Sequence, residues 1–362
     1  MSAGTILWWG RFDPDYSRNR VLRRLLETAG WTLRDFRPRL SPLGAWEAGL
    51  RGMPRPDLVW VPCFRQRDLA AAHAWCRRRG VPLLADPLIS AYDKQVFERR
   101  KLAAASRAAR RLRDWEARRL ALADCVLADT TAHAAFFRDE LGVADDRLFV
   151  VPVGAEEDHF TPQLWSAKGP EQPLEVLFYG SFIPLQGPQT IVAAARAYQG
   201  PPVTWTLLGE GPLLDECRTL AAGLDTVHFE GWLPYQELPQ RIGRADILLG
   251  IFGTTAKAAR VIPNKVYQAL ACGRPLVTMD SPAYPEAMRH STDAGISWVP
   301  AGDAAALAQA VSELAGRRPE LPKQGAAALA GFREYFSMAY IERQLMAALA
   351  SLGLPHGQPV GR

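Results

Sequence analysis

The sequence predicts an α/β protein of two domains, each built on a parallel β-sheet that is covered by helices on both faces. Three observations support this class. Short apolar runs alternate with helical segments of about ten to fifteen residues, which is typical of successive βαβ units. A proline-rich, irregular stretch at residues 161–173 separates two such series. The length of 362 residues is enough for two domains that each bury a core.

The first series should form residues 1–160. We expect its strands at residues 5–9, 31–36, 58–62, 81–85, 125–128 and 148–151, and its helices near 18–30, 67–79 and 94–120. Ligands of such sheets bind beyond the carboxyl ends of the strands. The loop at 10–13 and the loop at 86–93 should therefore share one rim.

The second series should form residues 174–335, after a linker at 161–173. We expect strands at residues 174–179, 203–208, 246–251 and 275–279, a further strand that begins at Val227, and helices near 188–198, 265–272 and 303–314. An amphipathic helix should cover residues 332–349, so that residues 336–350 lie beyond the second domain. The tail at 351–362 should be loose.

The composition excludes several classes of protein. Hydrophobic residues make up 48% of the chain and charged residues 22%, which is ordinary for a soluble globular protein. No apolar run is long enough to span a membrane, and the N-terminus lacks the pattern of a secretory signal. The five cysteines are odd in number and scattered, which favours reduced, buried thiols over disulfides or a zinc site. We therefore expect a cytoplasmic protein.

The net charge of +5 is concentrated in the first half of the chain. Residues 1–165 hold 27 basic and 21 acidic residues, and the run at 94–120 alone holds ten basic and three acidic ones. A basic amphipathic helix can lie on an anionic membrane surface, which would place the protein at the inner face of the membrane. A solvated helix face packed on its own domain fits the pattern as well. No recognition motif accompanies the charge, so we do not expect nucleic-acid binding.

The stretch at 257–275 carries the main functional signal. An apolar strand leads into a Pro-Asn-Lys turn and then a short helix, whose first N–H groups and partial positive charge suit phosphate oxygens. Pro263 suits the first turn of a helix, where its missing N–H costs nothing. Lys257, Arg260 and Lys265 add cations near the same point. An ordinary crossover with solvated charges remains the alternative.

Several motifs in their order along the chain are similar to those of a known family. They are Val151 to Phe160 (VPVGAEEDHF), Gly209-Glu210-Gly211-Pro212, Val227 to Pro234 (VHFEGWLP), Gln268 to Gly273 (QALACG) and Pro285-Glu286. With them the chain resembles the GT-B glycosyltransferases, in the retaining group 1 branch, family four. The resemblance implies two Rossmann-like domains that face each other across a cleft, with the donor nucleotide on the second domain and the acceptor on the first. It also implies a C-terminal helix that crosses back to the first domain.

This chain departs from the family pattern at four donor-site positions. Arg260 and Gln268 stand where the family has two glutamates, and Ser181 and Gln186 replace two loop cations. The histidine of a common His-Asp pair is also missing, because the chain reads Ala85-Asp86 there.

The resemblance implies transfer of a sugar from a nucleotide-diphosphate sugar to a glycan or lipid-linked acceptor, with retention of configuration, in cell-surface polysaccharide assembly. The scheme needs no cofactor, metal or protein nucleophile, because preorganised cations and N–H groups can stabilise the leaving diphosphate. The predicted catalytic residues are Arg260, Lys265 and Asp86. The predicted donor-binding residues are Gly180, Ser181, Gln186, Gly209, Leu233, Pro263, Asn264 and Gln268. The predicted acceptor-side residues are Gly10, Arg11, Asp13, Ser90 and Asp93.

The same residues allow other interpretations. Asp13-Pro14-Asp15 matches the D-x-D pattern of metal-dependent transferases, but the proline favours a turn and we reject a metal site. Asp86 and Ser90 could hold a polyol or simply cap a turn. A nucleotide-sugar epimerase would need acid–base groups in the cleft, where histidines are few. A non-catalytic paralogue that binds a glycan or partner is a further alternative, because both donor acids are lost. An NAD-linked oxidoreductase lacks the full glycine fingerprint.

Overall fold

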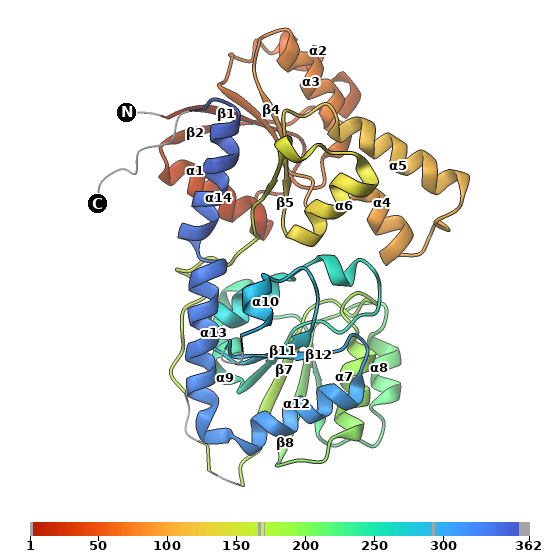
Figure 1. Ribbon diagram of the computed structural model, residues 1–362, viewed down its shortest axis with the longest axis vertical. Helices are drawn as coiled ribbons and strands as arrows, with labels where there is room; N and C mark the ends of the chain where they lie inside the picture. The colour runs from red at the N-terminus through yellow and green to blue at the C-terminus, as the bar shows by residue number, and fades with distance from the viewer. Residues whose placement is uncertain (1–2, 166–167, 170, 292–293, 355–362) are drawn as a thin grey trace. The chain divides into compact units, whose positions relative to one another are not determined.

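A computed structural model describes residues 3–165, 168–169, 171–291 and 294–354 of the chain. The chain divides into two compact units, which we describe separately (Figure 1). The first contains the chain up to Val153 together with the segment from Met338, and the second contains Gly154–Ser337. Both units are parallel α/β structures, which confirms the predicted fold class.

The first unit is built on a six-stranded parallel sheet in the order β2-β1-β3-β4-β5-β6. The strands are β1 (Gly4–Trp9), β2 (Trp31–Phe36), β3 (Leu58–Val61), β4 (Leu83–Ala85), β5 (Cys125–Ala128) and β6 (Leu148–Val150). Alternate strand residues enter two separate cores, because successive side chains point to opposite faces. Helix α1 (Ser17–Thr28) covers one face, and α2 (Gly44–Leu50), α3 (Leu69–Arg77), α5 (Arg107–Leu120) and α6 (Thr131–Leu141) cover the other.

The second unit repeats this plan with the order β12-β11-β10-β7-β8-β9. Its strands are β7 (Leu174–Tyr179), β8 (Val203–Leu208), β9 (Val227–Glu230), β10 (Ile247–Leu249), β11 (Leu276–Met279) and β12 (Ile296–Val299). Its helices are α7 (Pro188–Ala197), α8 (Leu214–Leu220), α9 (Leu238–Arg244), α10 (Asn264–Ala271), α11 (Glu286–Arg289), α12 (Ala304–Gly316) and α13 (Leu321–Tyr335). Helices α7 and α12 pack against the central strands in one apolar core.

The last helices differ in one respect from expectation. The single helix expected at 332–349 is two helices, α13 and α14 (Met338–Ser351), because the backbone leaves the helical region at Phe336, with φ of −138°. Helix α14 packs Ile341, Leu345 and Ala348 into the core that also contains α1. Figure 1 shows α14 and α1 side by side. The predicted return of the C-terminal helix to the first domain is confirmed. Most of the expected loose tail lies outside the described residues.

The basic run at 94–120 is also not one helix, contrary to expectation. A short helical segment, α4 (Ala91–Asp93) with one wider turn (Lys94–Glu98), ends before residues 99–106, where Arg100 takes a φ of 49°. Helix α5 then begins after Ser106, whose side chain accepts a hydrogen bond from the N–H of Ala109. A serine in this position is a favourable N-cap and starts a new helix.

Two expectations from composition can be compared with the structure. The five cysteines are all buried and free, as the sequence predicted. Among the described helices, none combines the length and apolar character needed to cross a bilayer.

Candidate functional site

The order of strands in the second sheet marks a place for a ligand. The chain winds from β7 to β8 and β9 on one side, and then returns to place β10, β11 and β12 on the other side of β7. In open α/β sheets, ligands bind outside the carboxyl ends of the strands where the winding reverses. Here that point lies between β7 and β10, where the loops at 180–187 and 250–263 leave the sheet.

Two glycines let these loops approach closely. Gly180 follows β7 with a φ of +146°, and a Cβ there would lie 2.7 Å from both Gln186 Oε1 and Lys265 Nζ. Gly209 follows β8 with a φ of +132°, and a Cβ there would collide with the carbonyl oxygen of Gly180. A side chain at either position would be strained and would fill the space that the neighbouring groups use. The structure thus brings three predicted donor-binding residues, Gly180, Gln186 and Gly209, together with the predicted catalytic residue Lys265.

Lys265 is the charged group at this junction. It lies in the first turn of α10 and is 4% exposed. Its Nζ donates to Gln186 Oε1 and lies 3.5 Å from the centroid of the Phe178 ring. Burial lowers the pKa of Lys265 well below its ordinary value, and among the described residues no carboxylate pairs with it. The site therefore holds a desolvated amino group whose charged form an anionic ligand would favour.

Tyr179 fixes the start of α10 against the sheet. Its hydroxyl lies 3.1 Å from the carbonyl oxygen of Lys265 and 3.1 Å from Gln268 Oε1, and both are acceptors. Burial raises the pKa of Tyr179 well above its ordinary value, so that the hydroxyl remains a donor. Sequence reasoning did not select Tyr179, although an aromatic hydroxyl at the carboxyl end of a strand was a visible signal.

The other predicted donor residues lie on the surrounding loops. Arg260 ends a short 3-10 turn, Ala258–Arg260, and is half-buried. Pro263 and Asn264 form the start of α10, and Ser181 follows Gly180; all three are half-buried. Leu233 is set apart from them, because it lies in the loop after β9, two strands from β7. The roles predicted for these residues stay predictions.

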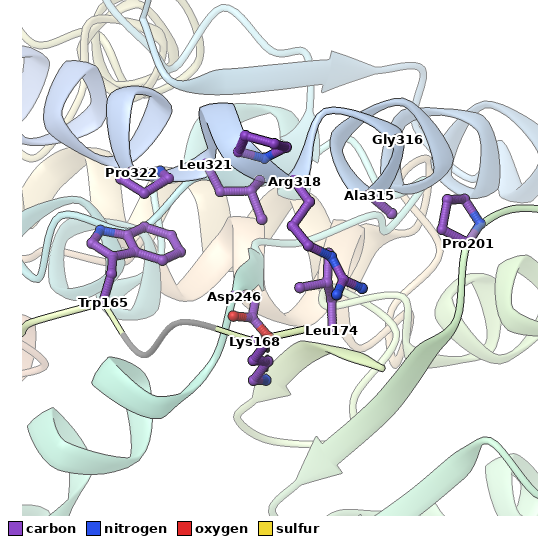
Figure 2. A pocket seen from close by; sticks show the side chains of 11 residues that line it. Trp165, Lys168, Leu174, Pro201, Asp246, Ala315, Gly316, Arg318, Leu321 and Pro322 are labelled. Atoms are coloured by element: carbon purple, nitrogen blue, oxygen red, sulfur yellow. Dashed lines mark hydrogen bonds and ion pairs between the residues drawn. The ribbon is translucent and has the colours of Figure 1, made fainter. Parts of the chain in front are cut away.

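A separate cavity lies at the opposite edge of the same sheet (Figure 2). Its volume is about 580 Å³. Its lining includes Leu174, the first residue of β7, and Asp246, the residue before β10. It is lined by Trp165, Lys168, Leu174, Pro201, Asp246, Ala315, Gly316, Arg318, Pro319, Leu321 and Pro322. Because it lies at the amino ends of the strands, it is not the place where a parallel sheet binds a nucleotide.

In the first unit, the loop after β1 carries three of the predicted acceptor residues. Gly10 is buried and its N–H donates to the carbonyl oxygen of Phe36 over 2.9 Å. Arg11 and Asp13 are exposed. Asp13 Oδ1 accepts a 2.9 Å hydrogen bond from the N–H of Asp15, which is the turn that we favoured over a metal site. Among the described residues, no group of three or more potential ligands could hold a metal ion.

Asp86, predicted to be catalytic, is fully buried in an ion pair. Arg18 Nε lies 2.8 Å from each of its carboxylate oxygens, and Arg18 Nη1 donates to the carbonyl oxygen of Val151 over 2.8 Å. Burial raises the pKa of Asp86, and the Arg18 guanidinium opposes this effect. These are the contacts of a residue that anchors the loop after β4. The predicted catalytic role stays a prediction, and sequence reasoning missed Arg18.

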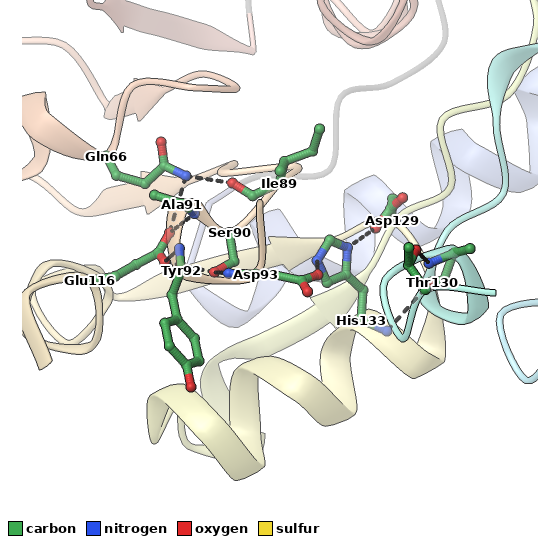
Figure 3. A network of polar contacts seen from close by, with 12 residues as sticks. Gln66, Ile89, Ser90, Ala91, Tyr92, Asp93, Glu116, Asp129, Thr130 and His133 are labelled. Carbon is green, nitrogen blue, oxygen red and sulfur yellow. Dashed lines mark hydrogen bonds and ion pairs between the residues drawn. The ribbon is translucent and has the colours of Figure 1, made fainter. Parts of the chain in front are cut away.

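Ser90 and Asp93 belong to a buried network around Glu116 (Figure 3). Ser90 Oγ donates to Glu116 Oε2 over 2.6 Å and accepts from the N–H of Asp93 over 3.1 Å. Glu116 also accepts from the N–H groups of Ala91 and Tyr92, at 2.7 and 2.8 Å. Ser90 therefore caps α4, which is the alternative that the sequence had left open. Glu116, one of three acids in the basic run, could have been noticed as the exception there.

A buried histidine lies beside this network. His133, in α6, is fully buried, and its Nδ1 lies 2.7 Å from Asp129 Oδ1. Its Nε2 makes no hydrogen bond and lies 3.9 Å from Asp93 Oδ2. Sequence reasoning did not select His133, since a single histidine in a short amphipathic helix carries no motif.

Family models match both units. The model described as "Glycosyl transferase 4-like domain" matches residues 8–154, and the one described as "Glycosyl transferases group 1" matches residues 173–317. Together these matches span most of the chain and both of its parallel sheets. The chain belongs to the GT-B glycosyltransferases.

Individual proteins resemble this glycosyltransferase to different extents. The amylovoran biosynthesis glycosyltransferase AmsK of Erwinia amylovora is 28% identical over 218 residues, which are 59% of this chain and 53% of AmsK. The chain thus matches about half the length of this curated relative. Among solved structures, Anabaena HepE in complex with UDP has a TM-score of 0.68 at 16% identity, covering 96% of this chain and 100% of that one. Sucrose-phosphate synthase from Thermosynechococcus elongatus has a TM-score of 0.72 at 17% identity, with 96% and 99% covered.

The structure shows the contacts of two residues that differ from the family pattern, Gln186 and Gln268. Gln186 stands where the resemblance places a loop cation, and its side-chain oxygen instead accepts a hydrogen bond from Lys265. The start of α10 thus places the amino group of Lys265 beside this loop. Gln268 replaces a glutamate of the family pattern and is neutral. No carboxylate at that position can therefore form an ion pair with Lys265.

Proposed function

We propose that the protein transfers a sugar from a nucleotide-diphosphate sugar to a glycan or lipid-linked acceptor, with retention of configuration. The observation that carries this proposal is the buried, unneutralised Lys265 beside Gly180, at the point where the winding of the second sheet reverses. The fold brings a helix N-terminus, a close approach along glycines and a basic side chain to one place. A diphosphate can accept hydrogen bonds from the helix N–H groups, fit beside the glycines and pair with the basic side chain.

The chemistry follows from charge development. As the bond between the anomeric carbon and the diphosphate breaks, negative charge grows on the leaving group and positive charge on the sugar. Lys265, Arg260 and the first N–H groups of α10 would stabilise the leaving diphosphate, and a leaving-phosphate oxygen would accept the proton of the acceptor hydroxyl. The scheme takes no nucleophile or metal from the protein. The UDP and UDP-glucose complexes of HepE support a uridine donor as the first to test.

The acceptor would bind to the first unit, at the carboxyl ends of β1 and β4. AmsK, whose name assigns it to amylovoran biosynthesis, supports an acceptor in polysaccharide assembly. A glycan acceptor that carries a lipid would place the enzyme at the inner face of the membrane.

The test is a donor screen followed by turnover. Nucleotide-sugars are screened by thermal shift, and each that binds is incubated with glycan and lipid-linked acceptors while nucleoside-diphosphate release is measured. NMR of the product then gives the anomeric configuration. A complete lack of donor binding would overturn the whole proposal. A product with inverted configuration would overturn the proposed retention of configuration.

A non-catalytic role is the second candidate, and one observation favours it. Arg260 and Gln268 occupy both positions where the family pattern has glutamates. A protein that binds a nucleotide-sugar or a glycan without any turnover, across the same acceptor panel, would support that alternative.

A further inference from the structure

The first unit carries an apolar surface that the proposed reaction does not use. Leu40, Leu43, Trp46 and Leu50, which we call the α2 ridge, are 60%, 51%, 66% and 67% exposed. They follow one another at three- and four-residue spacing along a short 3-10 turn, Ser41–Leu43, and α2. Residues at this spacing share one face of a helix. The ridge is therefore a continuous stripe of large apolar side chains in contact with water.

The other face of α2 explains why the ridge points outward. Ala48 is fully buried in the core of the unit, and a Cβ at Gly44 would lie 3.1 Å from the Trp9 ring. Small residues thus let the helix pack closely on the sheet, while the large apolar residues are on the solvent side. A helix normally has the opposite arrangement, and an exposed apolar stripe of this size marks a contact surface.

Two arginines lie along the ridge. A groove of about 400 Å³ runs along it, and Arg39 and Arg51 line this groove with the four apolar residues and Glu47. Glu47, the single acid between them, pairs with Arg51 and accepts the N–H of Arg39. The surface is therefore apolar at its centre and positively charged at its edge.

Helix α5, for which the sequence left open either a membrane contact or a solvated face, has a different character. Its buried residues Ala109 and Leu120 enter the core, and Leu112 packs against the same core. What α5 presents outward is mainly its arginines. Helix α3 contacts both α2 and α5, so that the three helices lie in one layer over the same face of the sheet. The exposed face of α5 is thus basic, and it lacks the exposed large apolar side chains that form the ridge.

We propose that the α2 ridge inserts into the interface of a lipid bilayer that contains anionic headgroups. Tryptophan with leucine at the acyl boundary, and arginine at the headgroups, is the composition that such interfacial helices share. Each exposed cation near the surface adds favourable attraction to anionic lipid. The positive edge makes anionic lipid a better partner than a neutral apolar protein face.

The position of the ridge suggests a role for this membrane contact in acceptor binding. This role rests on the proposed function. Ser41 Oγ accepts a 3.2 Å hydrogen bond from Arg65, and Arg65 packs against Gly10 on the predicted acceptor rim. The ridge therefore begins beside the carboxyl end of β1. A bilayer bound there would bring the headgroup of a lipid-linked acceptor close to this rim.

The experiment is vesicle flotation of the full chain with phosphatidylcholine alone or mixed with phosphatidylglycerol. The wild type should float with the mixed vesicles, and Trp46→Glu with Leu50→Glu should lower the bound fraction about tenfold or more, since both apolar insertions are lost. Leu164→Glu is the matched control, because Leu164 is 95% exposed in the second unit and lies outside the ridge. Its bound fraction should equal that of the wild type. Thermal melts should show that all variants are folded.

Several outcomes would overturn the inference. These are a wild type that binds neither vesicle, a ridge variant that floats unchanged, and loss of flotation in Arg107→Glu with Arg118→Glu while the ridge variant still binds. A dimer in light scattering that Trp46→Glu dissociates would assign the ridge to a second copy instead. Failure of the proposed function is separate, because it would appear as absent turnover in a protein whose ridge-dependent flotation persists.

Discussion

Replacement of Lys265 by methionine should change stability and ligand binding in opposite directions. The methionine keeps the apolar stem and removes the charge. In the ligand-free protein the lysine charge is buried without a carboxylate, and only Gln186 Oε1 and the Phe178 ring compensate it. A well-placed cation–π contact contributes up to about 2 kcal/mol. Replacing buried charges by apolar groups is often neutral or stabilising by roughly 1–4 kcal/mol, so we expect Lys265→Met to raise the free energy of unfolding by about 1–3 kcal/mol.

Binding of a nucleoside diphosphate should weaken strongly in the same variant. A buried charge-assisted contact is lost, which costs roughly 2–4 kcal/mol, or about 30- to 700-fold in Kd. UDP is the first ligand to use, measured by isothermal titration calorimetry, with urea unfolding for stability. Lys323→Met, at an exposed lysine of α13, is the control and should change neither quantity by more than about 0.5 kcal/mol.

The pH dependence provides a second measurement on Lys265. Burial lowers its pKa in the folded protein below the unfolded value of 10.5. Between the two pKa values the unfolded chain binds the extra proton, so the free energy of unfolding should rise with pH there, and this slope should be absent from Lys265→Met. At a pH above its lowered pKa, where Lys265 is neutral in the free protein, a bound diphosphate should restore the proton, and calorimetry in buffers of different ionisation enthalpy would detect this as uptake. Unchanged UDP affinity in Lys265→Met would refute the reasoning.

Three further predictions concern the backbone, the buried ion pair and metal. Gly209→Ala should lower the free energy of unfolding by roughly 2–4 kcal/mol in urea titrations, because of its positive φ and the collision with Gly180. Arg18→Met should cost roughly 3–5 kcal/mol, since it leaves Asp86 buried without its cation, and adding Asp86→Leu should recover most of that loss in the same titration. Removal of divalent metal with EDTA should leave the rate of nucleoside-diphosphate release unchanged, and a rate that falls and returns with Mg²⁺ would contradict the proposed scheme.

The parts of the fold that sequence predicted are those encoded locally. The strands at 31–36, 125–128 and 203–208 have the expected bounds. The run at 125–128 is continuously apolar, which specifies a buried parallel strand, and the other two begin and end on apolar residues beside turn residues. The glycine after β7 and the lysine at the start of α10 were also predictable, because each is a local signal, and the family resemblance placed both at one site.

What sequence could not provide depends on contacts between distant residues. Arg18 and Asp86 are 68 positions apart, and nothing near either one shows that they pair. Glu116 lies among arginines on α5, where its sign suggests only a surface charge, yet it organises the backbone at Ala91 and Tyr92. The α2 ridge was missed because a seven-residue helix with glycine at its start gives too short a pattern to show which face is buried.

Two of the buried basic residues, Arg18 and Lys265, allow a charge that is paired within the chain to be distinguished from one that is not. Arg18 and Lys265 are both removed from water, and each would be costly to bury alone. Arg18 has the Asp86 carboxylate and the Val151 carbonyl, so its charge is compensated within the first unit. Lys265 has only neutral partners among the described residues, and burial lowers its pKa, so an anion from outside the chain would favour its charged form. The two residues therefore differ in a testable way: the charge of Arg18 holds a loop within the first unit, whereas the charge of Lys265 should depend on a bound anion.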